Sequence, residues 1–201
     1  MVSFLTYALN LFIPLGIYYR MPNAIVIVGR PGSGKAVCAG YLKEFLPDTQ
    51  IINLGSIVRE RVLSEYGNTD RQTMQEASVG IRKALGKDII AAMAVQMVDR
   101  CKKYAVFVGV RDIAELKRIQ REFDTVIVAI QSPSRQRYDR LIKRNRSDDS
   151  KDVKQLAKRD VDEDTWSKID AVIETADIKL MNDGTLTQLK TAVRQLAKTL
   201  Q

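Results

Sequence analysis

The sequence predicts an α/β domain built on a mostly parallel β-sheet with helices on both faces. From Ala24 onward, short apolar runs rich in β-branched residues alternate with longer amphipathic stretches. This alternation is typical of parallel strands joined by crossover helices. A glycine-rich loop directly after the first apolar run indicates a ligand site at one end of that sheet. The length of 201 residues fits one domain.

Five short runs are expected to be strands covered on both faces, because they are β-branched and mostly uncharged. They span 24–28, 50–53, 105–108, 125–130 and 178–181. Helices are expected over roughly 34–45, 56–66, 71–103 with a break near Gly86, 112–123, 134–145, 152–173 and 185–200. Pro47, Gly67 and the Asn182-Asp183-Gly184 turn separate these elements.

Composition excludes several kinds of chemistry. The chain has no histidine, so a general base must be a carboxylate, Lys, Tyr or Cys. Two cysteines, Cys38 and Cys101, cannot form a disulfide framework and indicate a reducing compartment, so we expect a cytoplasmic protein. The net charge of +8 fits nucleic acid, an acidic membrane surface or phosphorylated small molecules as partners.

Residues 1–20 form an apolar extension ahead of a domain expected over 21–201. The stretch is interrupted by Asn10, Pro14 and Gly16, whereas a spanning helix needs about 20 predominantly apolar residues. It also lacks a basic n-region and a small-residue cleavage site. We therefore expect no membrane partner, although Tyr18-Tyr19-Arg20 resembles an interfacial edge and keeps a membrane anchor as an alternative. We interpret the extension as the result of an upstream start codon or as a tail that packs on the domain or on a second copy. A homodimer therefore remains one alternative for the oligomeric state.

The strongest motif is a phosphate-binding loop of the form GxxxxGK between a strand and a helix. It consists of Gly29, Arg30, Pro31, Gly32, Ser33, Gly34 and Lys35. Backbone N–H groups of such a loop bind phosphate oxygens, and the lysine reaches the β- and γ-phosphates of ATP. The next position normally supplies a hydroxyl to Mg²⁺, but here it is Ala36. One protein ligand for the metal is therefore missing, and no metal ligand is assigned with certainty.

Arginines are the other residues that phosphoryl transfer requires, because charge must be neutralised around the phosphates. Arg59 and Arg82 lie in a helical segment at about 55–100, and Arg111 follows the third strand, where ligands of open α/β sheets bind. Three more, Arg137, Arg140 and Arg144, share one face of a later helix. That face is read as a lid over a triphosphate, with a solvated face or a nucleic-acid site as alternatives. Only one aromatic residue, Tyr138, lies near it, which argues against stacking of single-stranded bases.

Six ordered motifs resemble archaeal nucleotide-kinase-like P-loop proteins of the adenylate-kinase-related and dephospho-CoA-kinase-like kind. They are GRPGSGK (29–35), LGSIVRE (54–60), IRKALGKDIIA (81–91), VGVRDIAEL (108–116), RYDRLIKRNRSDD (137–149) and ADIKLMNDGT (176–185). The resemblance implies a nucleoside-monophosphate-kinase-like three-layer sandwich with a five-stranded parallel sheet, an acceptor-binding segment at about 55–100 and an Arg-rich lid at about 134–165.

The same resemblance implies roles for individual residues. Arg59, Arg82 and Arg111 would contact a phosphate of the acceptor. The lid arginines, Arg137, Arg140, Arg144 and Arg146, would contact the transferring phosphates, and 182–185, beginning at Asn182, would contact the edge of adenine. The predicted catalytic residues are Lys35, Arg111, Arg140 and Arg144, together with Asp112, which is a hypothetical replacement for carboxylates that relatives carry elsewhere.

Two further departures from the family pattern concern carboxylates. Relatives tend to carry Gly-Asp where this chain has Gly55-Ser56, and Asp-Gly-Ile-Arg where it has Val108-Gly109-Val110-Arg111. One hypothesis is that Glu60, Asp112 or Glu115 holds Mg²⁺ or accepts the hydroxyl proton instead. The alternative is a pseudokinase that binds nucleotide without turnover.

These observations predict a kinase that uses ATP and Mg²⁺ to phosphorylate a hydroxyl of a phosphate-bearing metabolite. The resemblance extends to a kinase that acts on the 5-hydroxyl of mevalonate 3-phosphate, the acceptor we favour. A dephospho-CoA kinase or nucleotide kinase is the nearest alternative. A nucleotide-binding regulator and a nucleic-acid-associated ATPase are alternatives from other classes.

Overall fold

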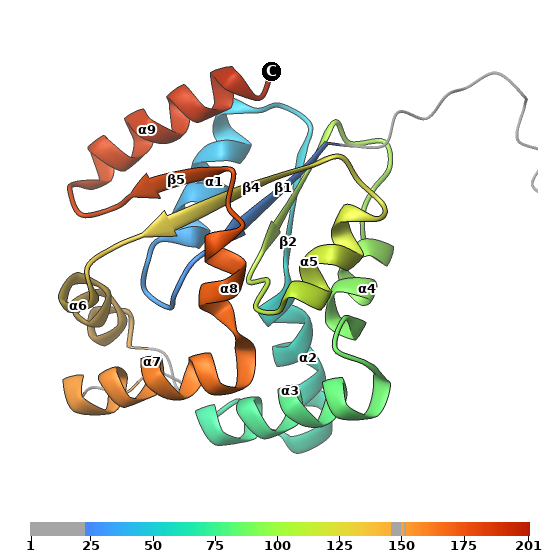
Figure 1. Cartoon of the computed structure of the whole chain (residues 1–201), viewed down its shortest axis with the longest axis vertical. Coiled ribbons are helices and arrows are strands. Elements are labelled where there is room, and N and C mark those ends of the chain that lie inside the picture. Colours follow the sequence, from blue (N-terminus) through green and yellow to red (C-terminus); the bar gives the residue numbers. More distant parts are fainter. Residues whose placement is uncertain (1–22, 146–149, 151) are drawn as a thin grey trace, which may run out of the picture.

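The domain is built on one parallel sheet, seen in a computed structural model that describes residues 23–145, 150 and 152–201. The strands are β1 (Asn23–Val28), β2 (Thr49–Asn53), β3 (Tyr104–Val108), β4 (Thr125–Gln131) and β5 (Ile178–Met181). They lie in the order β2-β3-β1-β4-β5, and every pairing is parallel (Figure 1). The predicted fold class and all five predicted strands are confirmed, with bounds that differ by one residue at most.

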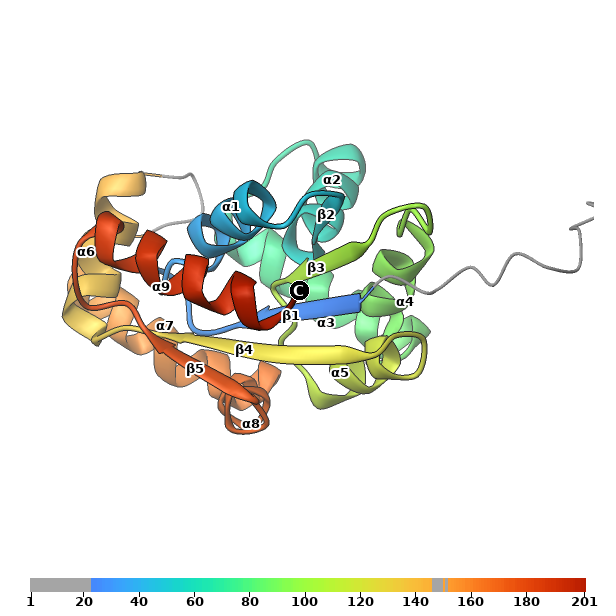
Figure 2. The same ribbon diagram turned by 90° about the horizontal axis from the view of Figure 1, so that it is seen from above.

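Helices cover both faces of the sheet, because strand residues alternate between its two sides. On one face, Ile25 and Ile27 of β1 pack with α1 (Lys35–Phe45) and α9 (Leu186–Thr199). On the other face, Val26 and Val28 pack with α2 (Leu54–Tyr66), α4 (Ile89–Gln96), α5 (Ile113–Gln120) and α8 (Ile169–Glu174). The view from above shows this three-layer arrangement (Figure 2). Both cores are fully buried, which explains why the strands are apolar along their whole length.

Two of the predicted helices are wrong in their extent. In the stretch expected over 71–103, the expected break near Gly86 is confirmed: α3 (Arg71–Leu85) and α4 are separate helices, and Gly86 adopts a positive φ of 107° between them. Beyond Gln96 the chain turns instead of continuing the helix, and the Asp99 carboxylate accepts a hydrogen bond from the backbone N–H of Cys101. The stretch expected over 152–173 is likewise divided, into α7 (Val153–Ser167) and α8, at Lys168, whose φ is 48°.

The topology brings the loops that follow the strands to one end of the sheet. β1 lies between β3 and β4, so the chain connections from β1 and β3 run to opposite sides, and ligands of open α/β sheets bind at such a switch point. The β4 arrow in Figure 1 points toward α6 (Ser134–Arg144), beside which α7 runs. The segments predicted to hold phosphate, acceptor and lid therefore meet at this end. No helix in the described part of the chain is both long enough and apolar enough to span a membrane.

Candidate functional site

The phosphate loop connects β1 to α1 and needs glycine at its tightest positions. Gly29, Gly32 and Gly34 all have φ between 78° and 146°, a region that side chains with a Cβ rarely adopt. A Cβ at Gly29 would overlap the carbonyl of Ile130, and a Cβ at Gly34 would overlap the Asn182 amide. Gly34 also precedes the first turn of α1, so the loop and a helix N-terminus form a concave anion site.

Lys35 lies across this loop. Its Nζ donates hydrogen bonds to the carbonyl oxygens of Gly29 at 2.6 Å and Arg30 at 3.0 Å. Burial lowers the pKa of Lys35 to about 7, with further lowering by Arg111, while Glu163 acts in the opposite direction. The ammonium group is therefore destabilised in this structure, and a bound anion would favour its charged form.

A single cavity of about 700 Å³ runs from the phosphate loop to α2 and α3. Its cationic lining residues are Lys35, Arg59, Arg82, Arg111, Arg140, Arg144 and Arg159. Glu163 is the one acidic residue among the described residues that line it. Leu54, Val58, Met74 and Ile90 supply an apolar wall beside α2 and α4. The cavity is thus large enough for two ligands and complementary to several phosphate groups.

Two buried carboxylates bind Arg82 and Arg111, two of the three arginines that were expected to contact the acceptor. Glu115, which is fully buried, accepts hydrogen bonds from Arg82 Nη2 at 2.6 Å and from the backbone N–H of Arg111 at 2.8 Å. Glu163 of α7 accepts from Arg111 Nη1 at 2.5 Å. Arg82 also donates to the Ser78 hydroxyl. Glu115 therefore positions arginines, and both of its oxygens are occupied, unlike those of a metal ligand or proton acceptor.

The other carboxylates of the sequence-based hypothesis do not line the cavity. Asp112 caps α5, where its Oδ1 accepts a hydrogen bond from the backbone N–H of Ala114 at 2.8 Å. Glu60 is exposed on α2. Asp112 and Glu60 are therefore both absent from the lining of the cavity in this structure.

The residues present do not form a metal site of their own. No group of three or more acidic, cysteine or histidine side chains is placed to bind a metal ion within the described ranges. Ala36 adds no hydroxyl to the loop. In general, Mg²⁺ keeps several waters and is commonly held through substrate phosphates.

Arg137 was expected on the transferring phosphates, but the structure gives it another partner. Its side chain is 4% exposed and is absent from the cavity lining. It donates to both oxygens of Asp160 on α7 and, at 3.1 Å, to the carbonyl of Pro31. Tyr138 also donates to Asp160, at 2.9 Å. In this structure Arg137 therefore holds α6 and α7 against the phosphate loop, and its side chain does not line the cavity.

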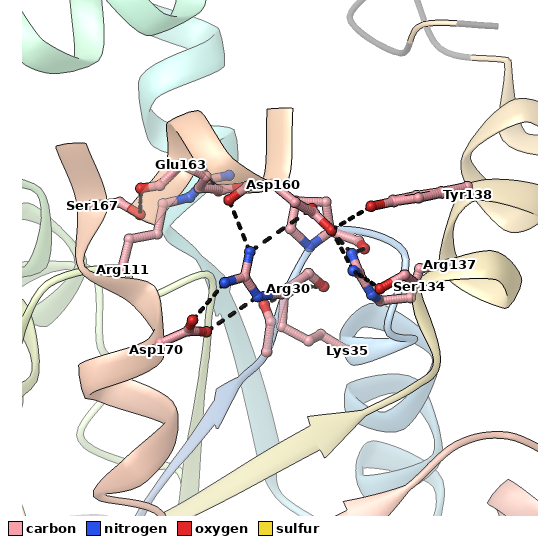
Figure 3. Close-up of polar contacts among 12 residues, drawn as sticks. Arg30, Lys35, Arg111, Ser134, Arg137, Tyr138, Asp160, Glu163, Ser167 and Asp170 are labelled. Atoms are coloured by element: carbon pink, nitrogen blue, oxygen red, sulfur yellow. Dashed lines mark hydrogen bonds and ion pairs between the residues drawn. The ribbon is translucent and has the colours of Figure 1, made fainter. Parts of the chain in front are cut away.

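Arg30 links the same loop to the end of the lid segment. Its guanidinium lies between Asp160 and Asp170 (Figure 3), with Nη2 2.5 Å from the Asp170 carboxylate and Nη1 2.9 Å from the Asp160 carbonyl. In the same view Arg111 reaches Glu163 on α7. α7 thus supplies carboxylates to Arg111 and Arg137, and α8 supplies one to Arg30.

Asn182 was expected to contact the edge of adenine, but its side-chain amide forms a hydrogen bond with the phosphate loop. Asn182 is 5% exposed, and its Nδ2 donates to the Ser33 carbonyl at 2.8 Å. Arg140 donates to the Asn182 carbonyl at 3.0 Å and to the Ser132 hydroxyl at 3.0 Å. Of the lid arginines, Arg140 and Arg144 line the cavity. Arg146 and residues 1–20 lie outside the described residues.

A family model described as an AAA domain matches residues 28–158, a range that begins at the phosphate loop and extends into α7. A UPF0200 protein of Sulfurisphaera tokodaii is 32% identical over 178 residues, covering 87% of this chain and 95% of that protein. One of Saccharolobus islandicus is 36% identical over 171 residues, covering 84% and 88%. The chain belongs to the UPF0200 family. Its matched region contains the phosphate loop and most of the cavity lining.

Solved structures show that this UPF0200 chain has the fold of P-loop kinases. The shikimate kinase of Bacteroides thetaiotaomicron superposes with a TM-score of 0.58 and 13% identity, over 89% of this chain and 98% of that one. The shikimate kinase of Acinetobacter baumannii, solved with shikimate, gives a TM-score of 0.55 and 16% identity, over 91% and 92%. At these identities the likeness concerns the fold alone.

Proposed function

We propose that the chain is a kinase that transfers the γ-phosphate of ATP to a hydroxyl group of a small molecule that already carries a phosphate. The observation that carries this proposal is the continuous cavity in which the phosphate loop and Arg59, Arg82 and Arg111 face one space. Lys35 and the loop N–H groups bind the β- and γ-phosphates, and Arg140 and Arg144 neutralise charge on the transferring group. Mg²⁺, carried in with ATP, shields the phosphate oxygens.

The acceptor end of the cavity favours a short anionic molecule with an apolar part. Arg59 and Arg111 supply positive charge, and Leu54, Val58 and Met74 supply an apolar wall. Mevalonate 3-phosphate, a branched hydroxy acid phosphate, fits these demands and is the acceptor we propose first. Dephospho-CoA and nucleoside monophosphates have the same kind of anionic group with a larger body, and are the alternatives.

The test is ADP release from Mg-ATP with a panel of acceptors: mevalonate 3-phosphate, mevalonate 5-phosphate, dephospho-CoA, AMP, CMP and none. We expect slow release without acceptor and a marked rise with one of them. Lys35→Ala removes the charge at the phosphates and should abolish turnover without unfolding the protein. Unchanged turnover in that variant would refute the role of the loop.

A second function, nucleotide binding without turnover, is favoured by one specific observation. Ala36 cannot donate a hydroxyl to Mg²⁺, and Glu163 is the one carboxylate that the described lining offers. A chain of this kind would bind ATP with similar affinity in Mg²⁺ and in EDTA, and would release no ADP with any acceptor of the panel. Calorimetric titration of ATP in both media separates the two functions.

A nucleic-acid-associated ATPase receives no support from the arrangement of the basic helix. Arg137 is buried, and Arg140 donates to the Asn182 carbonyl next to the phosphate loop. These side chains therefore face the cavity end of the sheet instead of forming a solvated basic surface for a phosphate backbone.

A further inference from the structure

Glu163 is the one acidic side chain among the described residues that line the cavity, and one of its two carboxylate oxygens accepts no hydrogen bond. The residue is 2% exposed. Its Oε1 accepts a hydrogen bond from Arg111, while its Oε2 has no hydrogen-bond partner among the described residues. Buried polar atoms nearly always have a partner, and a buried carboxylate oxygen without one is costly. The missing donor is therefore expected to come from a ligand in the cavity that Glu163 lines.

The position of Glu163 indicates which part of the ligand would supply that donor. Glu163 is close enough to Lys35 to raise the pKa of that lysine, and Lys35 is the proposed contact of the γ-phosphate. It is also bonded to Arg111, the proposed contact of the acceptor's phosphate. Glu163 thus lies where the donor and acceptor ends of the cavity meet, which is where the acceptor hydroxyl must be.

The charges around Glu163 distinguish a hydroxyl group from a metal ion as its partner. Seven cationic side chains in the described part of the chain line the cavity, and one of them, Arg111, is bonded directly to Glu163. A divalent cation at Glu163 would be repelled by the same group of cations. ATP phosphates carry acceptor oxygens and cannot donate at neutral pH. A hydroxyl group is uncharged and donates a hydrogen bond, so it suits the free Oε2.

We propose that Glu163 is a catalytic residue that binds the acceptor hydroxyl through Oε2 and accepts its proton; this rests on the proposed kinase function. In the step, the acceptor oxygen forms a bond to the γ-phosphorus, and the bond between that phosphorus and the β,γ-bridging oxygen breaks. ADP leaves with the electron pair of the broken bond. The hydroxyl proton passes to Glu163 and then to solvent, so ATP and the alcohol yield ADP, the phosphate ester and one proton.

The other carboxylates of the sequence-based hypothesis are less suited to this role. The sequence has no histidine. Asp112 and Glu60 are absent from the cavity lining, and both oxygens of Glu115 are occupied. Arg111 fixes one oxygen of Glu163 and so orients the carboxylate, while Oε2 keeps no partner among the described residues.

The test uses the full chain with Mg-ATP and mevalonate 3-phosphate, or with the other panel acceptor that it turns over. Glu163→Gln keeps the shape of the side chain and an oxygen for Arg111 but cannot accept a proton. We expect kcat to fall about a hundredfold or more, with the KM of the acceptor and the calorimetric affinity for ATP within about threefold of the unchanged protein. Asp162→Asn is the matched control, since Asp162 precedes Glu163 on α7, is exposed and does not line the cavity. It should leave kcat within about twofold, as surface substitutions usually do.

Three results would overturn the assignment. An unchanged kcat in Glu163→Gln excludes proton transfer to this residue. A raised acceptor KM with unchanged kcat would make Glu163 a positioning residue that acts through Arg111. A normal kcat that is restored only by higher Mg²⁺ would make it a metal ligand.

A second variant covers the case in which the amide destabilises the protein. Thermal unfolding is measured for both variants, and if Glu163→Gln does not fold, Glu163→Asp decides. The shorter carboxylate retains the charge and the proton acceptor at a longer reach, so kcat should fall about tenfold, less than with the amide. Full activity of a folded Glu163→Asp would count against a positioned base. If the unmodified chain binds ATP but phosphorylates no acceptor, the proposed kinase function is wrong, and the role of Glu163 is wrong with it. A loss of activity confined to the Glu163 variants is a different outcome, because the unmodified chain is then an active kinase.

Discussion

ATP binding near pH 8 should be accompanied by proton uptake at Lys35. Burial and the neighbouring Arg111 lower the pKa of Lys35 to about 7. At pH 8 roughly 0.9 of the free protein molecules therefore carry a neutral Lys35. The negative charge of bound phosphates favours the ammonium form and moves the pKa back toward its ordinary value of 10.5. Each ATP should then take up roughly 0.9 of a proton at pH 8 and about 0.1 at pH 6.

The same linkage determines the pH dependence of affinity. The charged fraction of Lys35 falls from about one half at pH 7 to about one tenth at pH 8, so the apparent affinity for ATP should weaken roughly fivefold over that interval. It should fall by about tenfold for each further pH unit until the pKa of the bound form is approached. The phosphates of ATP are fully ionised at pH 8 and add no proton uptake of their own.

Calorimetry measures the uptake directly. ATP is titrated into the protein at pH 8 in buffers with different ionisation enthalpies, such as HEPES and Tris, and the dependence of the apparent enthalpy on buffer gives the number of protons. Lys35→Arg keeps a positive charge that does not titrate, so its uptake should vanish while binding remains. Lys190→Arg, a matched change at a partly exposed lysine of α9, should retain the uptake. Absence of uptake in the unmodified chain, or its persistence in Lys35→Arg, would refute the burial of this ammonium group.

Three further predictions concern stability and reactivity. Asp160→Asn should destabilise the domain by about 3 kcal/mol at pH 7, because it leaves the buried Arg137 guanidinium without its counter-charge; a denaturant titration checks this, and a cost under 1 kcal/mol would contradict it. Burial raises the pKa of Asp160, but the bonds from Arg137 outweigh it and the net pKa is lowered. The ionised Asp160 carboxylate therefore stabilises the fold fully above the ordinary Asp pKa, and this stabilisation is lost as the pH falls through the lowered pKa. The free energies of unfolding of the unmodified protein and of Asp160→Asn should thus become similar in acid. Gly34→Ala should abolish ATP binding measured by calorimetry, since the loop has a φ of 103° there. A thiol reagent should label exposed Cys101 but not Cys38, whose pKa is raised by burial to about 12, until the protein unfolds; equal labelling of both would show that α1 opens.

The sheet and the phosphate loop could be predicted from the sequence because their signals are local. Each strand is a short β-branched run that is buried on both faces, and the loop has its glycines at fixed spacing. The break at Gly86 after α3 was also predictable, because glycine readily adopts the positive φ found there. The end of α7 was harder to predict, because Lys168 also adopts a positive φ and a lysine in that conformation has no sequence signature.

The carboxylates of α7 could not be assigned from the sequence because their partners are distant along the chain. Glu163 binds Arg111, which lies 52 residues earlier, and Asp160 binds Arg137, which lies 23 residues earlier. In the sequence they belong to an acidic stretch that resembles a solvated helix face. One signal was available: a spacing of three places both on one face of the helix, while Asp162 falls on another.

The lid helix shows why shared helix faces do not imply shared roles. Arg137 and Arg144 lie on the same face of α6, but seven residues of helix separate them by about 10 Å. At the first position the guanidinium is enclosed by Asp160 and the Pro31 carbonyl, whereas at the second it lines the cavity. A helix that begins beside the phosphate loop and ends over the cavity therefore places its first arginine in the structure of the loop and its last one within reach of a ligand. The division between the two roles is set by where the helix crosses the loop, a tertiary feature that charge spacing does not contain.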